Sequence, residues 1–94
     1  MIKIIVEDSS SFDRDLSNLR TDLKGELDAI DLYQKHIDET DNPTLKEVWT
    51  SIMEEEKVHV GELIKVINEQ HPKEEELFDD GQKEAEDMLD VKKP

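Results

Sequence analysis

The apolar side chains of this chain recur at helical spacing in two long runs, which a short helix-breaking segment separates. Residues three and four positions apart lie on one face of an α-helix, so such spacing predicts amphipathic helices. The first run predicts one long helix over residues 12–40. Gly25 lies inside it at a cost of about 1 kcal/mol, which indicates close packing at that position. The apolar residues of this run are Phe12, Leu16, Leu19, Leu23, Leu27, Ile30, Tyr33 and Ile37.

The segment TDNPT, residues 40–44, predicts the end of this helix and the start of another. Asn42 is a favourable N-cap, and Pro43 is a favourable first helical residue. We expect the second helix to cover residues 43–70, where the sequence QHP closes it. Its apolar stripe consists of Leu45, Val48, Trp49, Ile52, Leu63 and Ile67, widened by Val60 and Ile64.

The two ends of the chain carry weaker patterns. Residues 1–11 predict an extended segment from the run IKIIV, and Ser9, Ser10 and Ser11 follow it as candidate N-caps. Residues 73–90 predict a short C-terminal helix. We therefore expect a single all-α domain over residues 1–94, built as an antiparallel two-helix hairpin with this short helix appended. The apolar side of the short helix carries Leu77, Phe78, Ala85, Met88 and Leu89.

The chain is too short to bury a large core by itself. It has 94 residues, of which 40% are charged and 34% are hydrophobic. Small domains bury a low fraction of their surface, so we expect oligomerisation. A two-helix hairpin also leaves a full apolar stripe exposed. Two hairpins related by a two-fold axis would bury both stripes in a four-helix bundle, which predicts a homodimer.

The net charge limits the kinds of partner that the protein can bind. The net charge is −14, which argues against nucleic acid or an anionic membrane as a partner and suits the attraction of cations. The chain has no Cys, which excludes disulfides and thiolate chemistry. No apolar run approaches membrane-spanning length, and the start MIKIIVED does not have the pattern of a signal peptide. We expect a soluble cytoplasmic protein.

Three polar residues interrupt the apolar faces at one level. Glu56 and His59 lie in the middle of the stripe of the second helix, three residues apart and therefore on one face. Glu26 lies among the apolar residues of the first helix. Counted from the turn at Asn42, Glu26 and Glu56 are about 24 and 21 Å away at 1.5 Å per residue. The three inward side chains are therefore expected to meet.

Buried carboxylates need partners, and a metal ion can provide them. An unpaired buried charge costs several kcal/mol. Glu oxygen and neutral imidazole are both good ligands for divalent iron, manganese or zinc. Two-fold symmetry would double the set to four Glu and two His, which is the ligand complement of carboxylate-bridged di-iron bundles. A bare Glu-x-x-His is a weak signal, and the alternative is a surface salt-bridge face beside a wider apolar stripe.

The runs GELDAIDLYQKH (25–36) and EEEKVHVGEL (54–63) resemble the encapsulated ferritins, including the ferritin-like domain fused to some encapsulin shells. The resemblance covers roughly residues 20–68. It implies a ferritin-like fold in which two hairpins dimerise around a di-iron ferroxidase centre, with two Fe per dimer interface, and dimers assemble into a ring of ten. The family's metal ligands match Glu26, Glu56 and His59, and its nearby tyrosine matches Tyr33.

Three features depart from the family's pattern. Some members carry an acidic pair near the metal-access route, where this chain has Gly25 and Asp28. An aromatic residue before the tyrosine is Leu32 here. Many members end in a short apolar cargo peptide that docks inside the shell, and the terminal sequence DMLDVKKP does not match it. The resemblance still implies an encapsulin shell protein as partner and the lumen of an encapsulin nanocompartment as location.

The remaining aromatic and acidic residues have simpler interpretations. Tyr33 is a candidate catalytic residue, able to hydrogen-bond a ligand or pass electrons, or else a core tyrosine with a satisfied hydroxyl. We expect Trp49 in the core or dimer contact and His36 in solvent. His71 is expected to interact favourably with the helix dipole at the end of the second helix. Glu62 is a candidate accessory ligand at the stripe edge.

These observations predict an iron-oxidising enzyme that converts Fe(II) to Fe(III) with dioxygen. Metal affinity should fall in acid, because the imidazole must be deprotonated to bind. Two alternatives stay open. One is a di-iron peroxidase of the rubrerythrin type, which would need a separate reductase because this chain has no Cys. The other is a non-catalytic helical interaction module in which the polar residues fix the register.

Overall fold

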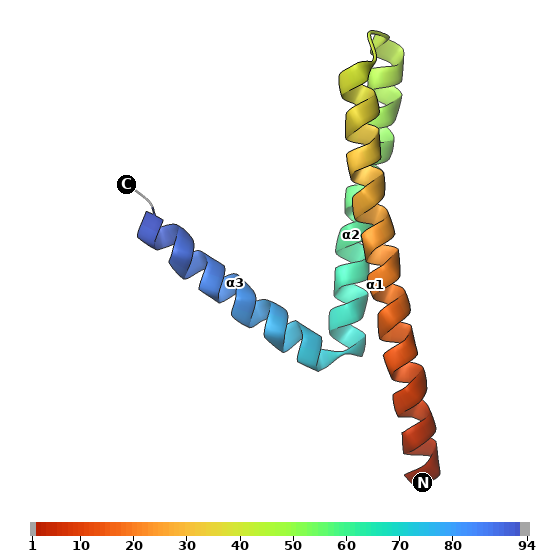
Figure 1. Cartoon of the computed structure of the whole chain (residues 1–94), viewed down its shortest axis with the longest axis vertical. Coiled ribbons are helices and arrows are strands. Elements are labelled where there is room, and N and C mark those ends of the chain that lie inside the picture. Colours follow the sequence, from red (N-terminus) through yellow and green to blue (C-terminus); the bar gives the residue numbers. More distant parts are fainter. Residues whose placement is uncertain (1, 93–94) are drawn as a thin grey trace. The chain divides into compact units, whose positions relative to one another are not determined.

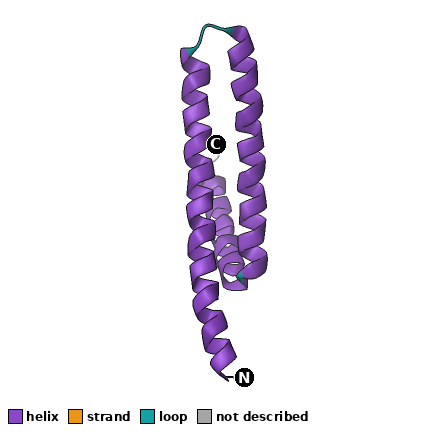
Figure 2. Ribbon diagram, turned by 90° about the vertical axis from the view of Figure 1, so that its right-hand side faces the viewer, coloured by secondary structure: helices purple, strands orange, loops and turns teal. Residues whose placement is uncertain are grey.

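The protein is helical throughout the part that the structure describes. A computed structural model describes the backbone of residues 2–92 and the side chains of residues 11–90. The elements are α1 (Ile2–Glu39), α2 (Pro43–Gln70) and α3 (Pro72–Lys92). Figure 2 shows that short loops alone join these helices and that the described residues contain no strand. The all-α prediction is confirmed. Over the same residues, no helix combines the length and the apolar character needed to cross a membrane.

The chain forms two compact units, residues 1–64 and residues 65–94. In the first unit, α1 and the part of α2 that it contains run side by side in opposite directions (Figure 1). This is the predicted antiparallel hairpin. The second unit holds the end of α2 and α3. The expectation of one domain over residues 1–94 stays a prediction.

The turn of the hairpin forms as its sequence predicts. Asn42 Oδ1 accepts hydrogen bonds from the amides of Thr44 at 2.9 Å and Leu45 at 3.3 Å. These bonds satisfy two of the amides that a helix start leaves without partners. Pro43 occupies the first helical position, where its missing N–H removes no hydrogen bond. The side chain of Thr40 accepts a hydrogen bond from the Asn42 amide at 3.1 Å, which tightens the connection.

Only part of the apolar stripe is covered within one chain. Ile67 of the α2 stripe and Met53, which lies outside the predicted stripe, are buried, and most stripe residues of α1 are half-buried. Other stripe residues stay open, with Leu27 50%, Leu45 40% and Val48 46% exposed. A Cβ built on Gly25 would meet no atom within 4 Å, so the close packing expected at that position is absent within the described chain. The hairpin therefore presents an apolar surface that its own residues do not fill.

The start of α1 differs from the prediction. Residues 1–11 were expected to form an extended segment, but α1 begins at Ile2, and the serines at 9–11 lie inside it. The physical reason is that no Gly or Pro occurs before Gly25. Each residue added to an existing helix gains one backbone hydrogen bond, so α1 can extend through β-branched residues and serines alike. Inside the helix, Arg14 Nη2 donates to Ser11 Oγ at 3.3 Å.

In the second unit, α3 begins almost where α2 ends. The amide of His71 donates to the carbonyl of Ile67 at 2.8 Å and so continues the bonding pattern of α2. Its carbonyl accepts from the amide of Glu74 at 2.9 Å, and Pro72 takes the first position of α3. The predicted helix over 73–90 is confirmed with slightly wider bounds. Its large apolar side chains Leu77, Phe78, Met88 and Leu89 are all exposed.

Candidate metal centre

The hairpin register brings Glu26, Glu56 and His59 together. Glu26 lies thirteen residues before the end of α1 at Glu39, and Glu56 lies thirteen residues after the start of α2 at Pro43. Both are therefore about 20 Å from the turn along their helices. His59 follows Glu56 by three residues and shares its face. All three residues belong to the first compact unit.

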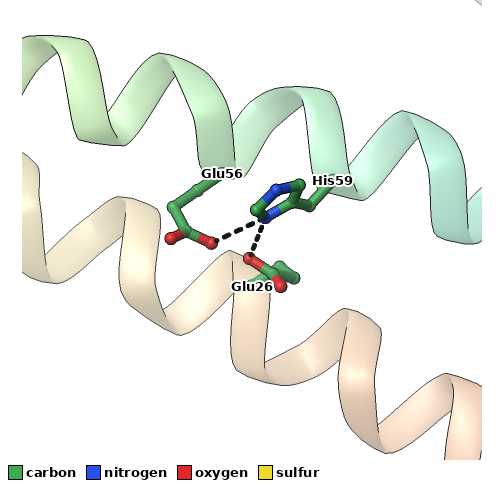
Figure 3. A network of polar contacts seen from close by, with 3 residues as sticks. All are labelled: Glu26, Glu56 and His59. Carbon is green, nitrogen blue, oxygen red and sulfur yellow. Dashed lines mark ion pairs between the residues drawn. The ribbon is translucent and has the colours of Figure 1, made fainter.

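The two carboxylates both lie close to one nitrogen of the His59 imidazole. Glu26 Oε2 and Glu56 Oε2 each lie 3.4 Å from His59 Nδ1. Figure 3 shows Glu26 reaching from α1 to meet the two residues of α2. Each residue offers a ligand atom, and these atoms lie within 4.8 Å of one another. Glu26 and Glu56 side chains are 25% and 19% exposed, whereas His59 is 46% exposed. The carboxylates thus lie deeper than the imidazole.

The deepest oxygen of this group lacks a hydrogen-bond donor. Glu26 Oε2 is buried and accepts no hydrogen bond within the described chain. A buried acceptor without a partner costs about 1–3 kcal/mol, and more when it is charged. A cation placed between the three side chains would satisfy this oxygen. The orphaned oxygen is therefore an independent sign that the group suits a metal ion.

Two of the three spacings between the donor atoms also fit one shared ion. Metal–oxygen and metal–nitrogen bonds of divalent transition metals are about 2.0–2.2 Å long. Two atoms bound to the same ion at angles between a right angle and a tetrahedral angle are then roughly 3.0–3.4 Å apart. The two distances of 3.4 Å to His59 Nδ1 agree with this range. Carboxylate and imidazole together suit iron, manganese and zinc.

Exposed apolar residues lie on the same two helices as the group. Val48 lies eleven residues before His59, which is three helical turns on the same side of α2. Leu27 follows Glu26 directly on α1. Val48 is 46% and Leu27 50% exposed. Exposed apolar residues on the helices that carry the group suit coverage by a partner.

A family model described as EncFtn-like matches residues 3–81. The chain belongs to the EncFtn-like family. The predicted resemblance to encapsulated ferritins is confirmed, and the match extends beyond residues 20–68 on both sides. With three helices and no strand in the described part, the ferritin-like all-α fold class is confirmed as well.

One curated relative of this EncFtn-like chain is the encapsulin nanocompartment cargo protein EncC of Myxococcus xanthus (strain DK1622). The two proteins are 45% identical over 42 residues. That stretch covers 45% of this chain and 32% of the relative, so the chain spans about a third of the length of the curated relative it matches. No solved structure matches the chain.

Tyr33, the remaining residue expected at the site of this EncFtn-like chain, makes a different contact. It lies seven residues after Glu26, which places it about 10 Å farther along α1. Its ring meets the ring of His36 edge-on, with 6.4 Å between the ring centroids and 84° between the planes. The structure therefore places Tyr33 beside His36, two helical turns from the group of three. Its catalytic role stays a prediction.

The prediction for His36 is wrong. It was expected in solvent, but it is half-buried and packs against Trp49, with 5.2 Å between the ring centroids. The reason is the hairpin register. His36 lies ten residues after Glu26, and Trp49 lies ten residues before His59, so the register that joins the first pair also joins the second. Ten residues make about 2.8 helical turns, so the register places the two pairs at matching levels but does not by itself fix their facing.

Glu26, Glu56 and His59 alone make up the candidate metal group among the described residues. Glu54, Glu55 and Glu62 are exposed, and the described residues contain no second cluster of three His, Cys, Asp or Glu that could hold an ion. His71 is only 3% exposed. Its expected interaction with the dipole of α2 stays a prediction.

Proposed function

We propose that two copies of this protein pair through the face that carries Glu26, Glu56 and His59 and that the pair oxidises Fe(II) to Fe(III) with dioxygen. The observation that carries the proposal is the convergence of two carboxylates on His59 Nδ1, with one carboxylate oxygen buried and without a hydrogen bond. Membership of the EncFtn-like family supports it. Iron is the substrate of this reaction.

The residues have distinct roles in holding Fe(II). The carboxylates of Glu26 and Glu56 supply negative charge at the inner side, where low water content strengthens their attraction for a cation. His59 supplies a neutral nitrogen donor at the outer side, and its exposure gives the ion access to the group. The net charge of −14 raises the local concentration of Fe(II) around the protein.

Pairing follows from what one hairpin lacks. Three donor atoms leave a divalent ion short of the six ligands that octahedral coordination requires. Two-fold symmetry would set four Glu and two His around two ions, as in di-iron bundles, and each carboxylate has two oxygens with which to bind one ion or both. It also covers Leu27, Leu45 and Val48, which one chain leaves open. The same contact thus completes the ion site and the core.

The electron count requires two irons to act together. Each Fe(II) gives one electron on becoming Fe(III). Dioxygen accepts two electrons and two protons and leaves as hydrogen peroxide. Two ions held side by side supply both electrons at one place, whereas a single ion supplies one. The carboxylates compensate the two positive charges that this oxidation adds, so they favour the ferric product.

We further propose that the protein works inside an encapsulin shell and that its dimers assemble into a larger ring. The relative from Myxococcus xanthus is named as a cargo protein of an encapsulin nanocompartment, which supports the shell as partner. A pair of short hairpins encloses no volume in which ferric mineral could grow. A surrounding shell would supply the confinement that the hairpin does not.

The test combines binding and turnover. Under nitrogen, Fe(II) should bind with a stoichiometry of one ion per chain. On exposure to air, ferric absorbance should then rise much faster than in protein-free buffer. Absence of binding under nitrogen would refute the metal site. Binding without accelerated oxidation would refute the activity and would favour a structural metal.

A further inference from the structure

Three aromatic rings form a continuous row in the first compact unit. Tyr33 meets His36 edge-on at 6.4 Å between centroids, and His36 meets Trp49 at 5.2 Å with 50° between the ring planes. All three side chains are half-buried. Tyr33 and Trp49 are the only tyrosine and the only tryptophan of the 94 residues. The two side chains that can be oxidised by one electron most readily therefore contact one histidine.

The row begins near the proposed iron site. Tyr33 lies seven residues after Glu26 on the inner face of α1, and Trp49 lies seven residues before Glu56 on α2. Each is about 10 Å from the metal group along its helix. His36 lies one further turn towards the hairpin loop and joins the two rings. If these positions served packing alone, other large side chains could fill them as well as Tyr33 and Trp49.

We propose that Tyr33, His36 and Trp49 form an electron relay that protects the protein when iron meets hydrogen peroxide. This rests on the proposed function, because the oxidation of two Fe(II) by dioxygen leaves peroxide as its product. Peroxide that meets one further Fe(II) receives a single electron and would split into hydroxide and a hydroxyl radical. A second electron delivered in time converts it fully to water.

Tyr33 supplies that second electron. One hydrogen peroxide, one Fe(II), the Tyr33 phenol and one proton from solvent yield two water molecules, Fe(III) and a neutral phenoxyl radical on Tyr33. The O–O bond breaks, Fe(II) and Tyr33 each lose one electron, and the phenolic proton ends in water. No hydroxyl radical is released in this step.

Trp49 then restores Tyr33. The indole gives one electron and its N–H proton goes to solvent, while Tyr33 regains one electron and one proton. The neutral indolyl radical on Trp49 is reduced by a Fe(II) ion from solution, which becomes Fe(III) as the indole takes up a proton. The sum is one peroxide and two Fe(II) consumed with two protons, giving two Fe(III) and two waters.

His36 is a positioning residue in this relay. It undergoes no net change, and its ring fills the space between the phenol and the indole. Electrons cross contacting rings more readily than a gap, so removing the imidazole should slow the exchange between Tyr33 and Trp49. A role in packing alone would change stability without changing that exchange.

The relay can be tested first without iron. In metal-free protein, azide radicals generated by pulse radiolysis oxidise Trp49 and Tyr33, and intensity should then pass between the indolyl and phenoxyl bands as the two residues exchange one electron. The rate should not depend on protein concentration. His36→Leu should lose this transfer, whereas Lys35→Leu, an exposed neighbour on α1, should keep it. Circular dichroism confirms that each variant is helical. Absence of transfer, or equal transfer in His36→Leu, would overturn the relay.

A second experiment links the relay to iron. Fe(II)-loaded protein is mixed with hydrogen peroxide under nitrogen, freeze-quenched and measured by electron paramagnetic resonance, with a spin trap for hydroxyl radical in a parallel sample. The wild type should show radicals at Tyr33 and Trp49. Trp49→Phe should keep only the phenoxyl signal, and Tyr33→Phe should lose both and release more trapped hydroxyl radical. Normal iron oxidation in air without any protein radical would refute the relay alone. Loss of iron oxidation itself would refute the proposed function.

Discussion

Glu26 is held in the hairpin at a cost to the metal-free protein. Its Oε2 is buried, lies 3.4 Å from His59 Nδ1 and accepts no hydrogen bond within the described chain. An apolar side chain of similar size would remove the unsatisfied oxygen and keep the packing. This loss of stability in the metal-free protein leaves the oxygen available for an ion, and such a loss is usual at a functional site.

Glu26→Leu should therefore stabilise the metal-free protein while abolishing iron binding. We expect the free energy of unfolding to rise on the order of 1 kcal/mol, because a buried unsatisfied acceptor is lost. Urea unfolding in the presence of a chelator measures this change, and anaerobic Fe(II) titration measures binding. Asp28→Leu, at an exposed position two residues along α1, is the control and should retain binding. A Glu26→Leu protein that binds iron normally would contradict the site.

Glu56→Ala and His59→Ala should each reduce iron oxidation to nearly the uncatalysed rate. Symmetry removes two ligands from each dimer for every substitution, so one change is enough. Stopped-flow ferric absorbance after mixing with air-saturated buffer is the measurement. Glu55→Ala removes a neighbouring exposed carboxylate and should leave the rate within about twofold, because surface substitutions rarely exceed 0.5 kcal/mol. Equal loss in Glu55→Ala would point to bulk charge as the cause.

The facing and level of Glu26, Glu56 and His59 could be predicted from the sequence, because helical rise and the turn at Asn42 fix both. The contact between His36 and Trp49 could not be predicted in the same way. His36 lies at the edge of the α1 stripe, and its environment depends on how α2 is rotated against α1. The sequence of one helix does not determine that rotation.

At the scale of the elements, the turn of the hairpin sets the register of everything that follows. Asn42 Oδ1 accepts two backbone amides, and no Gly or Pro interrupts α2 between Pro43 and Gly61. Loss of this cap should loosen the first turn of α2 without moving the site. Stability and site geometry can therefore be separated by substitution at Asn42.

Asn42→Ala should lower the free energy of unfolding by about 1 kcal/mol, the usual cost of losing an N-cap. Urea unfolding followed by circular dichroism measures this, with the slope unchanged. Asp41→Ala, an exposed loop neighbour, should cost little. If Asn42→Ala and Asp41→Ala have the same midpoint as the wild type, the cap does not stabilise the hairpin.

The extended segment predicted for residues 1–11 shows that a short apolar run does not distinguish a strand from a helix. IKIIV carries the β-branched residues typical of a strand, and a short apolar run fits strand or helix equally. No Gly or Pro occurs before Gly25 to interrupt a helix, and α1 extends to Ile2. The C-terminal helix was predicted from the helical spacing of its apolar residues, and the structure adds that Pro72 is its first residue and that Glu74 and Glu75 lie in its first turn.

At the scale of the whole molecule, we expect the hairpin to be completed by a second copy. The first compact unit carries three candidate ligands, of which the imidazole is half-exposed, and the exposed apolar residues Leu27, Leu45 and Val48. Without metal, two such faces would bring like charges together. With metal, the ions offset this repulsion. Assembly should therefore depend on the ion.

Native mass spectrometry should show larger species in the presence of Fe(II) than in the presence of a chelator. The shift should disappear in His59→Ala and persist in Glu55→Ala. A dimer that already exists without metal would still agree with the shared site if it gains two ions on loading. A chain that stays monomeric at saturating Fe(II) would contradict it.

The isolated protein should oxidise iron without keeping it in solution. At many equivalents of Fe(II) per chain in air, ferric product should leave the site and precipitate, because a pair of short hairpins encloses no volume for a mineral. Turbidity and sedimentation follow this directly. A clear solution with hundreds of irons sedimenting with the protein would indicate a closed cage.

The central claim is that two copies of this chain share two iron ions between their hairpins. Anomalous diffraction at the iron edge, from crystals grown or soaked with Fe(II) under nitrogen, tests it most directly. The account predicts two iron peaks related by a two-fold axis, each within bonding distance of Glu26, Glu56 or His59 side chains from both copies. A single peak bound by one chain alone, or iron only at the exposed carboxylates of α3, would contradict it.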